Sequence, residues 1–287
     1  MLEEKYILNN GIEIPKLGLG TWLINGEKVT QAVKEAIKLG YKHIDTAEAY
    51  GNEVEVGIGI KESGIPRKEI FLTTKLAAEA KDYETAKKCI EESLNKLDCD
   101  YIDLMIIHSP QPWAYVNKSE NRYEQGNLEA WKALEEYYKA GKIKAIGVSN
   151  FQVNDLKNIL ENAEIKPAVN QILCHISNTP LELINFCKDN NILVESYSPI
   201  AHGEILNNEK IKNIANKYNV SVAQLCIKYT IQLGTVSLPK ASTREHIEEN
   251  SKLDFIISDE DMEILKNIEH IKDYGNSSFF PVYGGKL

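Results

Sequence analysis

Cysteine is scarce in this 287-residue sequence, and no cysteine stands in a metal-binding arrangement. The five cysteines are odd in number, and no two of them form a C-x-x-C pair. The six histidines show neither H-x-x-x-H nor H-E-x-x-H spacing. These absences argue against a disulfide-stapled secreted domain and against a common zinc site. We therefore expect reduced cysteines, no metal and a cytoplasmic location.

Long apolar runs and a positive net charge are also lacking. No apolar run approaches the roughly 20 residues that a membrane-spanning helix needs, and the charged start, Met1–Lys5, does not resemble a signal peptide. The net charge is −9 and the pI about 5.3. Such a surface repels nucleic acid, although a small local basic pocket is compatible with it. We expect a monomer with a small-molecule substrate and without membrane or nucleic-acid partners.

A complete dinucleotide-binding glycine motif is missing as well. The segment Gly18–Trp22 lacks the third glycine of G-x-G-x-x-G and enters no obvious helix. This absence disfavours a doubly wound sheet. No Pro/Gly/Ser-rich linker or shift in composition divides the chain, so we expect one domain over residues 1–287.

The sequence does contain a regular alternation of short β-type runs and helical patterns. Residues Tyr6–Pro15, with an Asn-Gly pair at their centre, predict a β-hairpin. Eight short apolar runs follow, as expected for parallel strands that are buried on both faces. They are Leu17–Gly20, His43–Asp45, Ile70–Lys75, Ile102–His108, Ala145–Ser149, Ala168–Gln171, Leu193–Ser198 and Thr235–Pro239.

Amphipathic stretches separate these runs. Apolar residues recur at helical spacing over Val29–Ile37, Tyr83–Leu97 and Leu128–Tyr138. Eight strand–helix cycles in this length predict an α/β fold of the (β/α)8, or TIM, barrel type. We expect Ser109–Asn127 to form an irregular lid, and the tail after a last helical stretch at Asp259–Ile268 to lie over the barrel mouth.

Four ionisable side chains occur at or just after strand ends, namely Asp45, Tyr50, Lys75 and His108. Taken singly, each has a structural explanation: a helix cap, a packing aromatic, a solvated lysine and a hydrogen-bonded core histidine. Active sites of (β/α)8 enzymes lie at the C-terminal ends of the strands, where these four would converge. Their convergence over an apolar core favours a catalytic site.

The chemistry that suits these groups is proton transfer to a carbonyl oxygen. A tyrosine hydroxyl is protonated at neutral pH and can donate. At an effective dielectric constant of about 20, the Lys75 ammonium about 4 Å away would stabilise the Tyr50 anion by about 4 kcal/mol. Asp45 would hold Lys75 charged and in place. His108 could hydrogen-bond the substrate oxygen and orient the carbonyl.

Over nearly its whole length the chain resembles the aldo-keto reductases, and within them the small bacterial members of the 2,5-diketogluconate reductase type. Eight segments carry the resemblance in order and in register. They are G-L-G-T-W (Gly18–Trp22), H-I-D-T-A-x-x-Y-G-N-E (His43–Glu53), T-T-K-L (Thr73–Leu76), L-M-I-I-H-S-P (Leu104–Pro110), G-K-I-K-A-I-G-V-S-N-F (Gly141–Phe151), V-N-Q (Val169–Gln171), Y-S-P-I (Tyr197–Ile200) and L-P-K-A-S (Leu238–Ser242).

The resemblance implies a catalytic tetrad of Asp45, Tyr50, Lys75 and His108, with Tyr50 as general acid in the reduction of aldehydes and ketones. It also implies NAD(P)H extended across the barrel mouth. Ser149, Asn150 and Gln171 match residues that hold the carboxamide, and Tyr197 matches the aromatic that stacks on the nicotinamide. Trp22 and Trp113 match substrate-pocket walls, beside Tyr50 and His108. The expected cofactor-binding residues are Gly20, Thr21, Trp22, Asp45, Ser149, Asn150, Gln171, Tyr197, Ser198, Pro199, Ile200, Leu206, Lys240, Ala241, Ser242, Thr243, Arg244, His246, Glu249 and Asn250.

The segment after the last strand bears on the choice between NADPH and NADH. Ser242 or Thr243 would cap the following helix, so a phosphate could sit at the helix N-terminus. The resemblance implies that the adenosine 2′-phosphate binds here. Most NADPH-using members carry arginine six residues after Lys240, where this chain has His246, with Arg244 two residues earlier. We expect NADPH, with NADH possible.

Two other functions, one enzymatic and one non-catalytic, are compatible with parts of this pattern. A Schiff-base lyase could use Lys75, since barrel aldolases use a strand-end lysine, but pairing with Asp45 would keep that lysine cationic. A non-catalytic binding subunit could keep the barrel, as potassium-channel β-subunits resemble this family. The complete tetrad argues against lost chemistry.

Overall fold

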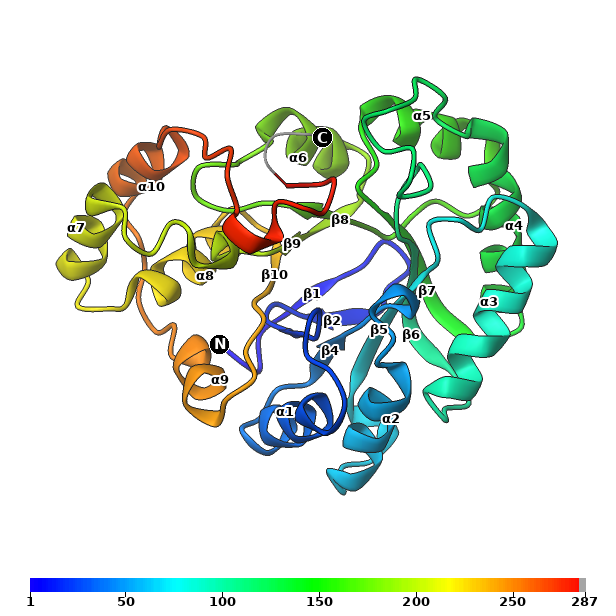
Figure 1. Ribbon diagram of the computed structural model, residues 1–287, viewed down its shortest axis with the longest axis horizontal. Helices are drawn as coiled ribbons and strands as arrows, with labels where there is room; N and C mark the ends of the chain where they lie inside the picture. Colours follow the sequence, from blue (N-terminus) through cyan, green and yellow to red (C-terminus); the bar gives the residue numbers. More distant parts are fainter. Residues whose placement is uncertain (284–287) are drawn as a thin grey trace.

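The computed structural model, which describes residues 1–283, is a barrel of eight parallel strands with helices around it (Figure 1). The barrel strands are β3 (Leu19–Gly20), β4 (His43–Asp45), β5 (Phe71–Leu76), β6 (Ile102–Ile107), β7 (Ile143–Ser149), β8 (Val169–Leu173), β9 (Leu193–Tyr197) and β10 (Val236–Leu238). Each strand pairs with the next in chain order. The (β/α)8 fold expected from the alternating pattern is confirmed.

Ten α-helices and four 3-10 turns connect the strands within the described part of the chain. The helices are α1 (Glu27–Lys38), α2 (Glu53–Glu62), α3 (Tyr83–Lys96), α4 (Glu124–Lys139), α5 (Val153–Asn162), α6 (Leu181–Asp189), α7 (Glu209–Lys217), α8 (Val222–Gln232), α9 (Arg244–Ser251) and α10 (Asp259–Lys266). The turns are η1 (Glu48–Tyr50), η2 (Arg67–Glu69), η3 (Ala201–Gly203) and η4 (Gly275–Ser277). Among residues 1–283, none of these helices is long and apolar enough to cross a bilayer.

The first and last strands close the barrel through a narrow seam. Single bridges join Leu17 to Ser237 and Gly20 to Lys240, and the Gly20 amide donates to the Pro239 carbonyl over 3.0 Å. A Cβ atom on Gly20 would lie 3.3 Å from the Leu238 carbonyl oxygen, so glycine permits this close approach. Because Leu17 makes only an isolated bridge, the regular strand covers Leu19–Gly20 and not the whole expected run Leu17–Gly20.

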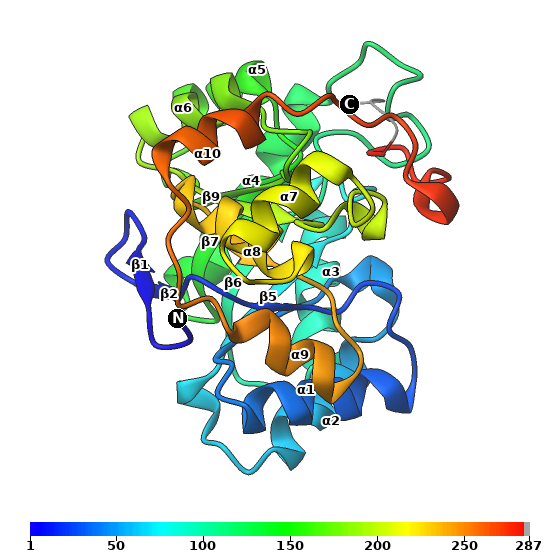
Figure 2. The ribbon, with the colours of Figure 1, turned by 90° about the vertical axis from the view of Figure 1, so that its left-hand side faces the viewer.

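The N-terminal hairpin covers the end of the barrel opposite the strands' C-terminal ends. Strands β1 (Lys5–Ile7) and β2 (Glu13–Pro15) pair antiparallel, and Gly11 has a φ of +84° in the loop between them. The Asn9 and Asn10 side chains donate to the carbonyls of Pro167 and Lys144, near the starts of β8 and β7. Figure 2 shows the hairpin and the C-terminal tail on opposite sides of the molecule.

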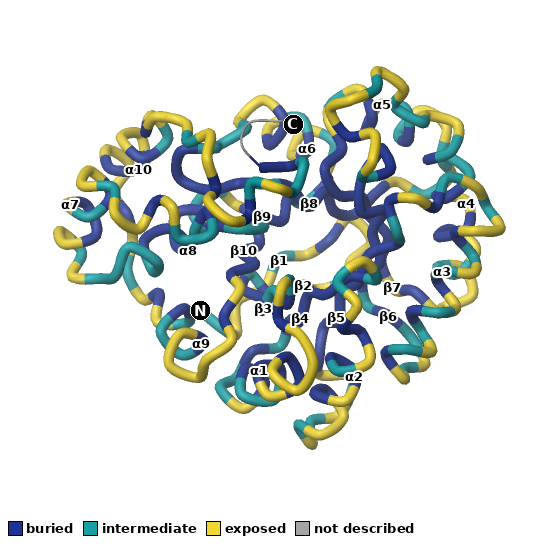
Figure 3. Tube along the Cα trace, viewed as in Figure 1, coloured by how far each residue is buried: buried dark blue, intermediate teal, exposed yellow. Residues whose placement is uncertain are grey.

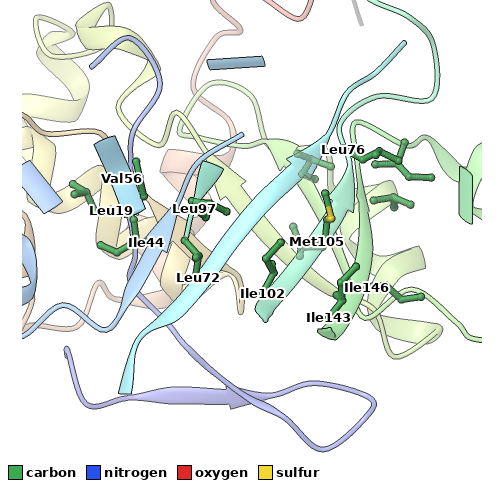
Figure 4. Close-up of a cluster of buried hydrophobic side chains, with 14 of the residues drawn as sticks. Leu19, Ile44, Val56, Leu72, Leu76, Leu97, Ile102, Met105, Ile143 and Ile146 are labelled. Carbon is green, nitrogen blue, oxygen red and sulfur yellow. The ribbon is translucent and has the colours of Figure 1, made fainter. Parts of the chain in front are cut away.

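Apolar side chains fill the space on both sides of the strands. Outward-facing residues such as Leu72, Met105 and Ile146 belong to the cluster between the strands and the helices (Figure 4). Leu104 and Ile106 belong to a separate cluster together with residues of the hairpin. Buried positions follow the strands while the outer faces of the helices are exposed (Figure 3). The barrel therefore gives rigid support to side chains at its C-terminal mouth.

The lid is shorter than the sequence suggested. Helix α4 begins at Glu124, so the irregular stretch after β6 ends at Tyr123 instead of Asn127. The Asn127 side chain helps to hold this stretch, because its amide donates to the carbonyls of Pro110 and Arg122.

Candidate active site

A cavity opens at the C-terminal ends of the barrel strands. It encloses about 1190 Å³, counted with the solvent at its mouth. Most of the expected site residues line it, namely Gly20, Thr21, Trp22, Asp45, Tyr50, His108, Trp113, Ser149, Asn150, Gln171, Tyr197, Ser198, Pro199, Ile200, Leu206 and Lys240. Lining residues that sequence reasoning missed include His202 and Val282.

Lys75 and Asp45 form a buried ion pair next to the cavity. Neighbouring strands β5 and β4 carry them, and the Lys75 Nζ lies 2.7 Å from Asp45 Oδ1 and 2.8 Å from the Thr46 carbonyl oxygen. The Lys75 side chain is 1% exposed and does not line the cavity. A lysine in this position cannot reach a substrate carbonyl, which disfavours the Schiff-base lyase.

Tyr50 stands at the end of the 3-10 turn η1 that follows β4. Gly51, with a φ of +65°, ends the turn, and Asn52 fixes the chain beyond it by donating to the Thr21 and Ile24 carbonyls. The Lys75 Nζ lies 4.9 Å from the centroid of the Tyr50 ring.

The electrostatic setting of Tyr50 differs from the one we expected. Burial, and then the Asp45 carboxylate, raise the pKa of Tyr50 well above its ordinary value. We expected Lys75 to stabilise the Tyr50 anion strongly. The ammonium is paired with Asp45, as expected, and the nearby carboxylate offsets part of the effect of Lys75 on Tyr50. Tyr50 is therefore held protonated at neutral pH.

His108 follows β6 directly and lies next to Tyr50 on the cavity wall. Its ring centroid lies 5.7 Å from that of Tyr50 and 5.0 Å from that of Trp113, in edge-to-face arrangements. Burial, and then the Lys75 charge, hold the pKa of His108 well below its ordinary value, so the ring is neutral. Among residues 1–283, His108 Nδ1 and Trp113 Nε1 are buried without a hydrogen-bond partner. Such atoms fit a site that takes a polar ligand.

A shelf of polar side chains lies at the ends of β7, β8 and β9. The Ser149 hydroxyl donates to the backbone carbonyl of Gln171 over 2.9 Å. The Asn150 side-chain Nδ2 donates to the backbone carbonyl of His108, and Asn150 Oδ1 accepts from the Tyr197 hydroxyl over 2.7 Å. Asn150 adopts a φ of +63°, a conformation that asparagine tolerates better than most residues. These contacts fix the shelf beside Tyr50 and His108.

A second carboxyl group, which sequence reasoning missed, lies buried behind this shelf. The Gln171 Nε2 donates both to Asp45 Oδ2, over 2.8 Å, and to Glu195 Oε2, over 2.9 Å. Glu195 is 0% exposed. The signal that could have found it is an ionisable residue in the middle of an otherwise uncharged strand, Leu193–Tyr197.

The C-terminal tail reaches the cavity mouth, as expected. The Phe280 ring centroid lies 4.7 Å from that of Trp113 and 5.6 Å from that of Trp22. The Tyr283 hydroxyl hydrogen-bonds the Ser198 hydroxyl over 3.0 Å. Phe279 is 71% exposed and does not line the cavity. The tail, which Figure 1 shows in red over the strands, therefore completes the aromatic wall.

The segment expected to bind the 2′-phosphate is only partly assembled. Lys240 is exposed and lines the cavity, and Thr243 caps α9 by accepting from the His246 amide. Arg244 instead pairs with Glu35 on α1, with 2.5 Å between Nη1 and Oε2. The expected residues from Ala241 onward, namely Ala241, Ser242, Thr243, Arg244, His246, Glu249 and Asn250, do not line the cavity.

Comparison with known proteins agrees with this architecture. The Aldo/keto reductase family model matches residues 16–270. Glyoxal reductase from Bacillus subtilis is 46% identical over 264 residues, which cover 91% of each chain. The narrower resemblance to 2,5-diketogluconate reductases stays a prediction.

Solved structures match as well. An aldo-keto reductase from a Medee basin deep-sea metagenome library superposes with a TM-score of 0.86 at 40% identity, covering 92% of this chain and 94% of the other. An aldo-keto reductase of Bombyx mori, solved in complex with NADP, superposes with a TM-score of 0.86 at 30% identity, covering 100% and 99%. The chain therefore belongs to the aldo/keto reductase family, a family of NAD(P)H-dependent carbonyl reductases.

Proposed function

We propose that this protein reduces uncharged aldehydes and ketones with NADPH, and that the Tyr50 hydroxyl gives its proton to the carbonyl oxygen. The observation that carries the proposal is the placing of Tyr50 and His108 on one cavity wall, with the Lys75–Asp45 pair buried next to them. A substrate carbonyl oxygen within hydrogen-bond reach of both side chains would meet a protonated phenol and a neutral imidazole.

Proton donation follows from the state of these two groups. The raised pKa of Tyr50 keeps its hydroxyl protonated, and the neutral His108 can hydrogen-bond the same oxygen and orient it. Bound NADPH supplies the hydride that reaches the carbonyl carbon. As Tyr50 loses its proton, the Lys75 ammonium 4.9 Å from the ring centroid attracts the developing negative charge, and water then returns a proton to Tyr50.

The shelf has the chemistry of a nicotinamide site. Ser149, Asn150 and Gln171 would hold the carboxamide, and the Tyr197 ring offers a flat face beside them. Both N–H groups of Gln171 are occupied by carboxyl oxygens, which leaves its Oε1 to accept from the carboxamide. These residues fit the cofactor without rearrangement of their mutual hydrogen bonds.

The preference for NADPH is supported by Lys240. This exposed cation lines the cavity next to the N-terminus of α9, where a phosphate would gain from both the ammonium and the helix dipole. Arg244 contributes less, because Glu35 already pairs with it. The complex of the Bombyx mori relative with NADP agrees with this choice.

The aromatic wall supports an uncharged substrate. Trp22, Trp113 and Phe280 bound the mouth, and Lys75 is paired with Asp45 and buried, so its charge is not available to an anionic substrate. One relative reported above is a glyoxal reductase. We propose glyoxal, methylglyoxal and benzaldehyde as substrates and expect the anion glyoxylate to be poor.

The test follows the absorbance of NADPH and NADH at matched concentrations with each of these four carbonyls. We expect turnover of the three uncharged ones, with kcat/KM at least tenfold higher for NADPH. Absence of turnover with every carbonyl, although NADPH binds, would favour a non-catalytic binding subunit. Glyoxylate as the best substrate would contradict the charge argument.

We also propose a cytoplasmic monomer that binds no nucleic acid. The five cysteines are free in the structure, as suits a reducing compartment, and the net charge of −9 disfavours polyanions. Light scattering after gel filtration should give a mass near 32.4 kDa. Twice that mass would contradict the monomer.

A further inference from the structure

Glu195 is a carboxyl group in the barrel interior that proton donation does not use. It lies in the middle of β9 and is 0% exposed. Its Oε2 accepts from Gln171 Nε2 over 2.9 Å. Its Oε1 lies 3.8 Å from His43 Nε2 and has no hydrogen-bond partner among residues 1–283. A fully buried carboxyl group with one partner is costly, and such groups concentrate at functional sites.

The ionisable groups that face Glu195 come from β4 and β5, two strands that are not next to β9 in the sheet. β4 contributes Asp45 and His43, and β5 contributes Lys75; β8 contributes the uncharged Gln171, and β10 pairs through Val236. Lys75 is already balanced by Asp45. Burial, with Lys75 as the next cause, lowers the pKa of His43 to about 3, so this ring supplies no positive charge.

This charge balance favours the protonated form of Glu195. Burial is the main cause that raises the pKa of this carboxyl group, and the Asp45 charge adds to it. A proton on Glu195 leaves the cluster with one cation and one anion. Loss of that proton would place a second carboxylate next to the Gln171 amide, and the two carboxylates would compete for the single Lys75 charge.

Gln171 links this cluster to the cavity. An amide whose nitrogen faces two carboxyl oxygens cannot flip, because its own oxygen would then face them. The contacts to Asp45 and Glu195 therefore fix which atom of Gln171 is offered to a ligand on the cavity wall.

We propose that Glu195 is a positioning residue of the reductase, which holds the Gln171 amide in its cofactor-binding orientation and, while protonated, keeps the Asp45–Lys75 pair electrically balanced. This inference rests on the proposed function, because it assumes that Gln171 contacts the carboxamide. Ionisation of Glu195 then weakens NADPH binding and turnover at alkaline pH.

Two substitutions separate the hydrogen bond from the charge. Glu195→Gln keeps an acceptor for Gln171 and cannot ionise, so NADPH affinity near pH 7 should stay within twofold of the wild type. The alkaline fall of kcat/KM should shift to higher pH or disappear. Glu195→Leu removes the acceptor, and the dissociation constant for NADPH should rise about 3- to 10-fold. Fluorescence titration and pH–rate profiles measure both.

A stability measurement reports on Glu195 without cofactor. A carboxyl group whose pKa is raised in the folded state contributes stability that is fully present below its unfolded pKa and is lost as pH rises through the folded pKa. Urea unfolding of the apoprotein should therefore show the wild type losing stability relative to Glu195→Gln as the pH is raised from about 5 to 9.

Glu53→Gln is the matched control. Glu53 is a buried carboxyl group whose pKa burial also raises, but it bonds Thr74 and does not line the cavity. This variant can change stability and should leave NADPH affinity and the pH–rate profile unchanged.

The outcomes distinguish the two levels of the argument. A wild type that neither binds NADPH nor reduces carbonyls overturns the proposed function and this inference with it. An active wild type whose alkaline limb is identical in Glu195→Gln overturns the inference alone. If Glu195→Leu does not fold, the pH profile and the unfolding series of Glu195→Gln decide by themselves.

Discussion

Replacing Lys75 with methionine tests the central ion pair most directly. The substitution removes an ammonium that is 1% exposed and 2.7 Å from Asp45 Oδ1. Asp45 then keeps the Gln171 amide as its remaining side-chain donor. Removing one partner of a buried pair costs about 3–5 kcal/mol of unfolding free energy, because an uncompensated charge stays behind. For a domain of this size, Tm should fall by roughly 5–15 °C.

A set of three variants separates stability from chemistry. Asp45→Asn should lose stability comparably, because Lys75 then lacks its counterion. The double variant Lys75→Met/Asp45→Asn should recover part of the loss, since no unpaired charge remains. Turnover should fall at least 100-fold in all three variants, because Tyr50 loses either its cation or the group that positions it.

Urea unfolding at pH 7 and single-turnover kinetics of the same preparations measure both quantities. Losses that simply add in the double variant would refute the pairing argument, because they would show independent roles for the two charges. If the Lys75→Met variant turned over at the wild-type rate, the proposed coupling between the Asp45–Lys75 pair and Tyr50 would be refuted.

Three further substitutions probe the cavity. Tyr50→Phe should lower kcat by about 10²- to 10⁴-fold with cofactor affinity and Tm nearly unchanged, and activity above a tenth of the wild type would reject Tyr50 as donor. Lys240→Ala should raise the dissociation constant for NADPH roughly 10- to 100-fold and that for NADH little, as fluorescence titration would show. Arg244→Ala should do much less, because Glu35 already engages Arg244; an equal effect would mean that the pair opens for the phosphate. Ending the chain after Tyr274 should change kcat/KM more for small carbonyls than for bulky ones, whereas equal losses would indicate a folding role.

The barrel could be predicted because its signals are local. The predicted run His43–Asp45 coincides with β4, and the predicted run Leu193–Ser198 ends one residue after the observed β9. The apolar spacing of Val29–Ile37 coincides with the buried face of α1. The proximity of the four candidate residues could be predicted from the rule that active sites of such barrels lie at the C-terminal ends of the strands. The Asp45–Lys75 contact could be predicted because the two residues lie on strands that are adjacent in the barrel.

The remaining features depend on contacts between distant segments. The Gln171–Glu195 contact depends on which face of β9 turns inward, and the sequence shows no alternation there that would reveal it. Arg244 finds Glu35 on a helix from the other end of the chain. The tail was expected over the mouth, but its described end, residues 278–283, contains no helix or strand, so no periodicity shows which of its side chains line the cavity.

The seam between β3 and β10 gives ligand binding a consequence beyond catalysis. Few backbone hydrogen bonds hold the first strand to the last, among them those of Gly18 and Gly20 to the carbonyls of Ser237 and Pro239. Gly20 and Lys240 both line the cavity, so a ligand seated there contacts both sides of the seam. Opening the barrel at this point would cost the binding energy of the ligand as well as the bridges. Hydrogen exchange at the Gly18, Gly20 and Ser237 amides should therefore slow on saturation with NADPH. The exchange rate at the seam would then report whether the cavity is occupied.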